Sequence, residues 1–185
     1  MQIKDSISIE VPREKVFSAL TDVEILKTSI PGCENLEALN EMKYSATILS
    51  KIGPLKLRFK GQAQLLDIVE PESYTIQGEG SGGPAGRAKV TARVTLQEIN
   101  NSTILEYDVN AEVGGKLAQL GGSLLSNTAK KLATQFFKNF NESIQSSDTT
   151  SSSSTNLSKT LSKISYKLLI IIVLFFSGIS AVFLL

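Results

Sequence analysis

The period of the apolar residues changes once along this chain, and that change restricts the possible folds most strongly. Residues 55–69 alternate every second residue, which is typical of a long antiparallel strand with one solvent-facing side. The inward set is Leu57, Phe59, Ala63 and Leu65, and the outward set is Lys56, Arg58, Lys60, Gln62 and Gln64. After Gly114 and Gly115 the period becomes 3.6, which predicts one long helix. Its apolar stripe consists of Leu117, Leu120, Leu124, Leu132, Phe136 and Phe140.

The remaining patterns predict one strand, two short helices, six strands and the long helix, in that order. Alternation begins at Ile3, Pro12 suits the first turn of a helix, and Asp22 suits the N-cap of a second helix. The other alternating segments lie at 36–39, 44–49, 55–69, 74–80, 88–96 and 105–113. An α+β fold, with a curved antiparallel sheet of about seven strands around a long C-terminal helix, buries these apolar faces most simply.

The segment 168–185 carries no charge and is long enough to predict a transmembrane helix; the alternative is a buried core helix. Lys159, Lys163 and Lys167 precede it at four-residue spacing, which favours a cytoplasmic flank beside anionic lipid. The expected organisation is a globular domain (1–145), a Ser/Thr-rich flexible linker (146–158), a basic juxtamembrane segment (159–167) and a single-pass C-terminal anchor (168–185). We therefore expect a cell-membrane protein whose N-terminal domain faces the cytoplasm.

Composition excludes several kinds of chemistry. The chain has no histidine and one cysteine, so a Ser-His-Asp or Cys-His nucleophile and a zinc site of the usual kind are absent. Lys plus Arg is 19 and Asp plus Glu is 18, and this balance does not suggest nucleic-acid binding. Glu106 and Asp108 alternate with the inward set of their strand and should point outward, which argues against a carboxylate pair in a pocket. We expect no catalytic residues, no metal site and no covalently bound cofactor.

Short motifs add a family resemblance that covers about residues 1–145. The element order resembles the helix-grip fold of the START-like (SRPBCC) superfamily, and the local sequence is similar to the CoxG family of carbon monoxide dehydrogenase subunits. The motifs are SIPGCE at 29–34, KIGP at 51–54, FKG at 59–61, Pro71 with Tyr74, the glycines between 78 and 86, Leu117 to Gly121 in KLAQLG, and Phe136, Phe137 and Phe140. Each motif is weak alone, but their order and spacing together are specific.

The resemblance implies a non-catalytic accessory protein. Its partner would be a molybdenum hydroxylase such as carbon monoxide dehydrogenase, recruited to the membrane, and its ligand would be a quinone or another isoprenoid. Two alternatives remain: a membrane adaptor without a ligand, and a cyclase- or hydrolase-type enzyme on the same fold.

The inward faces of the predicted strands are rich in glycine and alanine, so the space between sheet and helix is either a ligand cavity or a filled core around a sharply bent sheet. Gly121 would serve close helix-to-sheet contact or leave room for a ligand. Lys56, Arg58 and Lys60 form either a solvated face or a surface for lipid headgroups or a partner. The candidate cavity residues, chosen by face and position, are Leu57, Phe59, Tyr74, Val90, Val94, Tyr107, Leu117, Leu120 and Leu124.

Overall fold

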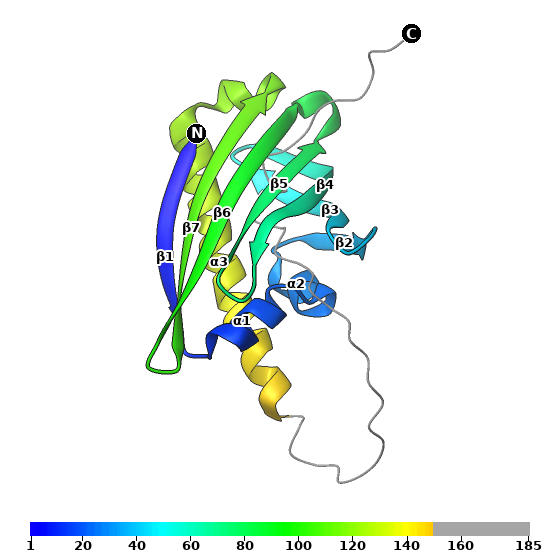
Figure 1. Cartoon of the computed structure of the whole chain (residues 1–185). Helices are drawn as coiled ribbons and strands as arrows, with labels where there is room; N and C mark the ends of the chain where they lie inside the picture. Colours follow the sequence, from blue (N-terminus) through cyan, green and yellow to red (C-terminus); the bar gives the residue numbers. More distant parts are fainter. Residues whose placement is uncertain (150–185) are drawn as a thin grey trace.

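The computed structural model describes residues 1–149, which form one curved sheet and a long helix (Figure 1). The elements are β1 (Gln2–Ile9), α1 (Arg13–Ala19), α2 (Val23–Ser29), β2 (Cys33–Ala38), β3 (Lys43–Ile52), β4 (Leu55–Val69), β5 (Ser73–Ser81), η1 (Gly83–Ala85), β6 (Arg87–Ile99), β7 (Ser102–Gly114), η2 (Gly115–Leu120) and α3 (Gly122–Thr149). The predicted order of strands and helices is confirmed. The predicted linker residues 150–158, the basic segment and the anchor lie outside the described residues.

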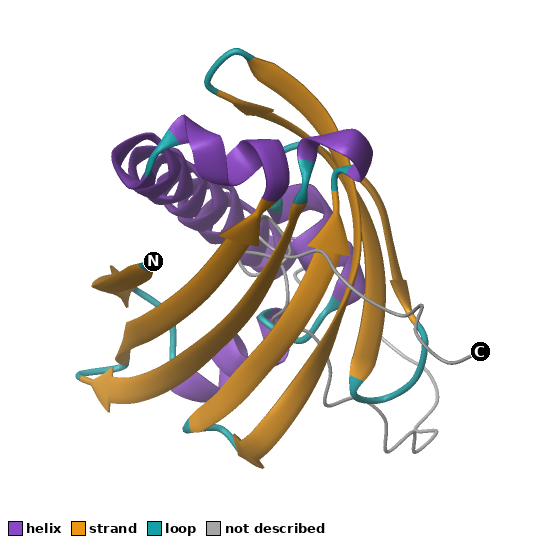
Figure 2. Ribbon diagram, turned by 90° about the horizontal axis from the view of Figure 1, so that it is seen from above, coloured by secondary structure: helices purple, strands orange, loops and turns teal. Residues whose placement is uncertain are grey.

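All seven strands belong to one antiparallel sheet with the order β1-β7-β6-β5-β4-β3-β2. Figure 2 shows this sheet curving around α3, as the α+β helix-grip architecture requires. The β6–β7 turn uses Asn100 and Asn101, both with positive φ (52° and 66°). This left-handed pair matches the right-handed twist of the flanking strands, and asparagine adopts it at low cost.

The two short helices form where their capping residues were expected. Asp22 Oδ1 accepts hydrogen bonds from the N–H groups of Glu24 (2.8 Å) and Ile25 (3.0 Å), which satisfies free donors at the start of α2. Pro12 is the N-cap of α1, one position before the helix begins. Val16 and Phe17 of α1 are buried, so this helix packs over one end of the sheet's inner face.

The long helix differs from the prediction, because the apolar stripe does not lie on one helix. Residues 115–120 form the 3-10 helix η2, and α3 begins only at Gly122. Gly121 separates the two with φ +85°, a left-handed conformation that glycine adopts without a Cβ clash. A Cβ added to Gly121 would meet no atom within 4 Å, so the expected close helix-to-sheet contact at this glycine is wrong. At its other end α3 extends to Thr149, so residues 146–149 of the predicted linker are helical.

The described chain holds no helix with the length and apolar character needed to cross a bilayer. The predicted span 168–185 is outside that part of the chain and stays a prediction.

Candidate ligand-binding interior

The register of the strands brings the small inward-facing residues together. Ala63 lies opposite Gly78, Gly61 lies opposite Gly80, and Gly80 lies opposite Ala88. We call this group the small-residue belt, and it consists of Ala46, Gly61, Ala63, Gly78, Gly80, Ala88 and Ala111. The belt has members on five neighbouring strands, β3 to β7, and Val90 lies between Gly78 and Ala111 in the same cross-strand row.

The helix that faces this sheet is also lined with small residues along its middle. Between Leu125 and Phe136, the buried positions of α3 are Ala129 and Ala133. The backbone of α3 approaches those of α2, β3 and η2, and it stays further from the central strands β5 and β6. Small residues on a helix and a sheet usually permit close approach, and the closest approach of α3 to the sheet is at β3. The alanines of the belt are buried and belong to the hydrophobic core.

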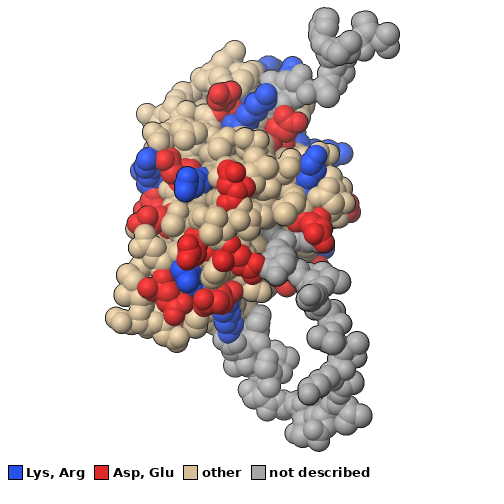
Figure 3. Space-filling view, viewed as in Figure 1, with Lys and Arg blue, Asp and Glu red and all other residues tan. Residues whose placement is uncertain are grey.

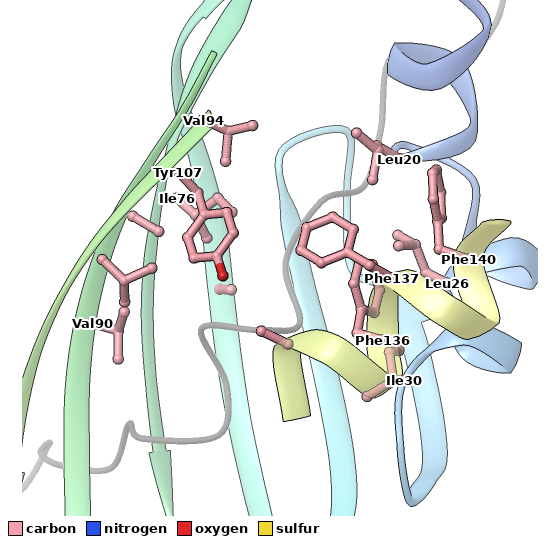
Figure 4. Packing of buried hydrophobic residues seen from close by; sticks show 14 of the residues in the cluster. Leu20, Leu26, Ile30, Ile76, Val90, Val94, Tyr107, Phe136, Phe137 and Phe140 are labelled. Carbon is pink, nitrogen blue, oxygen red and sulfur yellow. The ribbon is translucent and has the colours of Figure 1, made fainter. Parts of the chain in front are cut away.

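One end of the interior, next to α1, is filled by aromatic side chains, and we call it the aromatic end. Phe17 meets Tyr74 edge to face (5.8 Å between centroids), and Tyr107 stacks on Phe137 (5.9 Å). Phe136 contacts both Phe137 and Phe140. Figure 4 shows Tyr107, Val94 and Ile76 on the sheet, with Phe137 reaching towards Tyr107 from α3. These rings belong to one continuous hydrophobic core, which also includes Ala46, Ala63, Ala88 and Ala111 of the belt.

The other end is formed by the β3–β4 turn with η1 and η2, and we call it the glycine end. Gly86 and Gly115 bring η1 and η2 together so closely that a Cβ on Gly115 would lie 2.6 Å from the Gly86 Cα. Leu55, Leu57 and Leu120 are half-buried here. In Figure 1 α3 runs from this end, at the top, to beyond α1 at the bottom. The interior is thus bounded by aromatic packing at one end and by half-buried leucines at the other.

The structure places the nine predicted cavity residues in three environments. Six are buried: Phe59, Tyr74, Val90, Val94, Tyr107 and Leu117. Leu57 and Leu120 are half-buried, and Leu124 lies on the surface with 36% exposure. Tyr74, Val94 and Tyr107 are neighbours in one cross-strand row at the aromatic end, so they belong to the packed core.

Leu124 lies outside the interior because the break at Gly121 shifts the phase of the helix. A continuous helix would have kept Leu124 in line with Leu117 and Leu120, whereas α3 buries Leu125 instead. The Leu124 side chain rests over the β3–β4 turn, where a Cβ on Gly53 would lie 2.8 Å from Leu124 Cδ2.

Two buried hydroxyl groups on the inner face have no hydrogen-bond partner among the described residues: Tyr74 and Ser50. Tyr74 is 1% exposed, and burial raises the pKa of its hydroxyl well above the ordinary value, so the group stays protonated. The pKa of Tyr107 rises to about 12, through burial and the nearby Asp5 carboxylate. A buried hydroxyl without a hydrogen-bond partner lowers the stability of the folded protein, so a ligand that forms a hydrogen bond with it would bind more tightly. The sequence prediction missed Ser50. The signal that could have identified it is the alternation of β3, which continues as far as Ile52.

The carboxylates considered for acid–base chemistry point away from the interior, as predicted. Glu106 is exposed on the outer face, and Asp108 pairs with Lys4 Nζ at 2.7 Å. Hydrogen bonds from Lys4 and Gln2 hold the pKa of Asp108 below its ordinary value. Within residues 1–149 no three His, Cys, Asp or Glu side chains gather in a way that would hold a metal ion.

A shallow depression of about 410 Å³ lies on the outer face of β3 to β6. Its lining is mainly polar and includes Lys43, Gln62, Gln64, Gln77, Glu79 and Lys89. Such a lining does not suit an apolar ligand, so the inner face is the better candidate.

A curved seven-stranded antiparallel sheet around a C-terminal helix defines the START-like, helix-grip class of proteins. A solved START superfamily protein from Mycobacterium smegmatis has a TM-score of 0.61 and 14% identity, and the match covers 78% of this chain and 97% of that one. A structure from Thermus thermophilus has a TM-score of 0.61 and 14% identity, with 80% of this chain and 99% of that chain covered. At this identity the likeness shows the fold alone.

Two closer matches identify the family. The model of the carbon monoxide dehydrogenase CoxG subunit matches residues 6–145. The crystal structure of a conserved protein from Geobacillus kaustophilus is 34% identical with a TM-score of 0.75, and the match covers 80% of this chain and 97% of that one. The chain belongs to the CoxG family. Comparison with curated proteins gives no match.

Proposed function

We propose that this protein is a non-catalytic accessory protein that binds a quinone and recruits a molybdenum hydroxylase, such as carbon monoxide dehydrogenase, to the cytoplasmic membrane. The family and its START-like fold support a ligand-binding accessory role. The description of the family, a subunit of carbon monoxide dehydrogenase, supports the choice of partner. The uncharged segment 168–185 and the lysines before it support a membrane anchor with the domain on the cytoplasmic side.

The small-residue belt is the observation that carries the ligand proposal. Glycine and alanine occupy seven inward positions on five neighbouring strands, and the α3 backbone comes closest to α2, β3 and η2. We assign this space to the isoprenoid chain of the ligand. Burial of each CH₂ group is worth about 0.8 kcal/mol, so a long chain gains substantially by leaving water.

The unpaired hydroxyl of Tyr74 favours a quinone over a plain hydrocarbon. Tyr74 is protonated and buried, and it can donate one hydrogen bond to a carbonyl oxygen. Because Tyr74 is buried against Phe17, a quinone ring would enter the aromatic end only with movement of these side chains. Its carbonyl would then satisfy the Tyr74 donor, while its chain extends along the belt towards the glycine end. A hydrocarbon without an acceptor would leave the hydroxyl unpaired.

Tethering explains why a soluble enzyme would need such a partner. The electron acceptor is confined to lipid, whereas the enzyme diffuses in the cytoplasm. A membrane-anchored domain that binds both raises their effective concentration near each other. In this scheme the protein holds and presents the acceptor, and the chemistry belongs to the partner enzyme.

Solvent extraction tests the ligand. Full-length protein, made in a quinone-containing host and purified in mild detergent, is extracted with organic solvent, and quinones are quantified by mass spectrometry. Ala63→Leu fills the belt, and Gln62→Leu adds the same side chain on the outer face of the same strand. We expect quinone with the native protein and Q62L, and little with A63L. Equal amounts in all three would indicate detergent-borne lipid, and none in any would indicate a ligand-free adaptor; both overturn quinone binding.

Membrane sedimentation tests recruitment separately. Membranes containing the full-length protein are mixed with a purified molybdenum hydroxylase, and the enzyme that pellets is measured. Membranes from cells expressing a variant truncated after residue 149 provide the control. Recruitment predicts that the enzyme pellets only with the full-length chain, and an enzyme that stays in the supernatant with both would contradict it.

A further inference from the structure

The glycine end carries a group of exposed positive charges on elements that are distant in sequence. Lys51 and Lys56 lie directly opposite each other beside the β3–β4 turn, and Lys60, Arg87 and Lys116 surround the same end. None of these five forms an ion pair with another described residue. Arg58, between them, is instead held by Glu34. Two like charges opposite each other in a sheet are unfavourable, so this arrangement favours an anionic partner.

The aromatic end has the opposite character. Acidic residues dominate the turns and short helices there: Glu10, Glu14, Asp22, Glu24, Glu70, Glu72 and Glu98. In Figure 3 acidic side chains gather over the lower part of the molecule, where α1 lies. The turns and short helices at the aromatic end therefore carry an excess of acidic residues, although the net charge of the whole chain is +1. An anionic surface would attract the glycine end and repel the aromatic end.

Apolar side chains lie at the same end of the domain as the basic group. Leu124 is 36% exposed at the start of α3 and lies against Gly53. Leu55, Leu57 and Leu120 are half-buried around it. One exposed and three half-buried leucines at the same end as the lysines match the interface of a lipid bilayer, where apolar groups enter the acyl boundary and lysines reach the headgroups.

We propose that the glycine end docks on an anionic lipid surface. The inference rests on the proposed function, because it assumes that the domain works at a membrane. It adds the orientation: the half-buried leucines at the rim of the interior face the bilayer, and the acidic aromatic end faces the cytoplasm. An isoprenoid chain then passes between the bilayer and the small-residue belt without crossing water.

The length of chain beyond α3 permits this orientation. Helix α3 begins at the glycine end and ends past α1, and its 28 residues span about 42 Å. Residues 150–167, between α3 and the predicted anchor, can extend at most about 60 Å. The connection is therefore long enough to return along the domain to the membrane on which the glycine end rests.

Tryptophan fluorescence tests the orientation, because the native chain contains no tryptophan. Leu124→Trp reports on the glycine end, and Ile99→Trp is the matched reporter at the far end, where Ile99 is 52% exposed beside the β6–β7 turn. Each full-length variant is reconstituted into phosphatidylcholine–phosphatidylglycerol vesicles that contain brominated lipid as a quencher. We expect strong quenching of L124W and little quenching of I99W.

Charge variants test the electrostatic part. Lys51→Glu with Lys56→Glu, placed on L124W, should lower the docked-to-undocked ratio by about 30-fold or more, because each lysine near an anionic surface is worth about 1 kcal/mol. Lys27→Glu with Lys138→Glu makes the same change in net charge away from the glycine end, and quenching should persist.

Four outcomes would overturn the orientation while leaving the extraction test of the proposed function standing. They are stronger quenching of I99W than of L124W, no quenching of either, quenching that is equal in neutral and anionic vesicles, and an L124W signal that changes only when the molybdenum hydroxylase is added. The last would make the glycine end a protein interface. Failure of the proposed function is distinct, because it appears as absence of quinone in the solvent extract.

Discussion

The aromatic end and the small-residue belt lie on the same strands, yet they are built from opposite kinds of side chain. At the aromatic end, rings from α1, the sheet and α3 pack at centroid distances of 5.1–5.9 Å. Along the belt, most inward positions of those strands are glycine and alanine, with Val90 as the exception between Gly78 and Ala111. Strand hydrogen bonding continues through both regions, so the sheet does not need large side chains at the belt. The comparison suggests that packing energy is concentrated at one end, which leaves the belt free for a ligand.

Removal of a ring from the aromatic end should give the largest effect. Phe140 is fully buried and stacks on Phe136. We expect Phe140→Ala to lower the free energy of unfolding by about 3–5 kcal/mol, because the lost contacts leave a cavity. Chemical denaturation of the full-length protein in mild detergent, followed by circular dichroism, measures the change. Leu132→Ala, at a half-buried position of the same helix, is the control and should cost less; an equal cost would mean that the aromatic end is not the main core.

The Tyr74 hydroxyl belongs to the aromatic end but is proposed to act on the ligand. Tyr74→Phe removes an unpaired buried hydroxyl and should raise the free energy of unfolding of ligand-free protein by about 1 kcal/mol. The same change should weaken quinone binding while leaving binding of a matched hydrocarbon unchanged. Tyr107→Phe is the control, because Asp5 already stabilises the Tyr107 hydroxyl and its loss should not raise stability. A Y74F protein that binds quinone with native affinity would remove Tyr74 from the site.

The sequence predicted the inward faces of the strands better than it predicted the small-residue belt. Alternation in β4 and β6 identified the inward residues, because a period of two survives whatever the sheet packs against. The belt itself depends on register, since Gly61, Gly80 and Ala88 are neighbours only once β4, β5 and β6 pair. The small inward-facing residues indicated a possible ligand space, and the family resemblance supplied much of the preference for a cavity over a filled core.

The break at Gly121 could not be predicted from spacing. Leu117, Leu120 and Leu124 fit one helical stripe, and nothing in the letters shows that Gly121 adopts φ +85°. The basic glycine end was missed for a related reason. Lys56 and Lys60 were recognised on one strand, but Arg87 and Lys116 join them only through the tertiary fold. A local sequence pattern predicts which face of a strand or helix is buried. The residues that meet at one end of a domain come from distant segments, so a local pattern does not predict them.

Enlargement of one belt residue tests whether the space exists, and the expected change in stability is small. Ala63→Leu should alter the free energy of unfolding of ligand-free protein by less than about 1 kcal/mol, whereas overpacking a filled core would cost about 1–3 kcal/mol. Gln62→Leu, on the outer face, gives the reference for adding leucine to this strand. A clear loss of stability in A63L alone would show that the belt is a filled core and that the two regions do not differ in packing.

The weakest expected effect concerns an ion pair within the basic group of the glycine end, between Arg58 and Glu34. Arg58 donates to Glu34 through Nε and Nη2 at 2.6 and 2.8 Å, and this bond, helped by the Lys56 charge, holds the pKa of Glu34 below its ordinary value near 4.5. A lowered pKa means that the pair contributes above the unfolded-state pKa and is lost as the pH falls through the folded-state value. Because both groups are exposed, stability should barely respond, and NMR titration of the Glu34 carboxyl is the sensitive measurement. Arg58→Gln should return this pKa close to its ordinary value, and Lys56→Gln should raise it less. If K56Q had the larger effect, Arg58 would not be neutralised by Glu34, and it would join the positive charges available to an anionic surface.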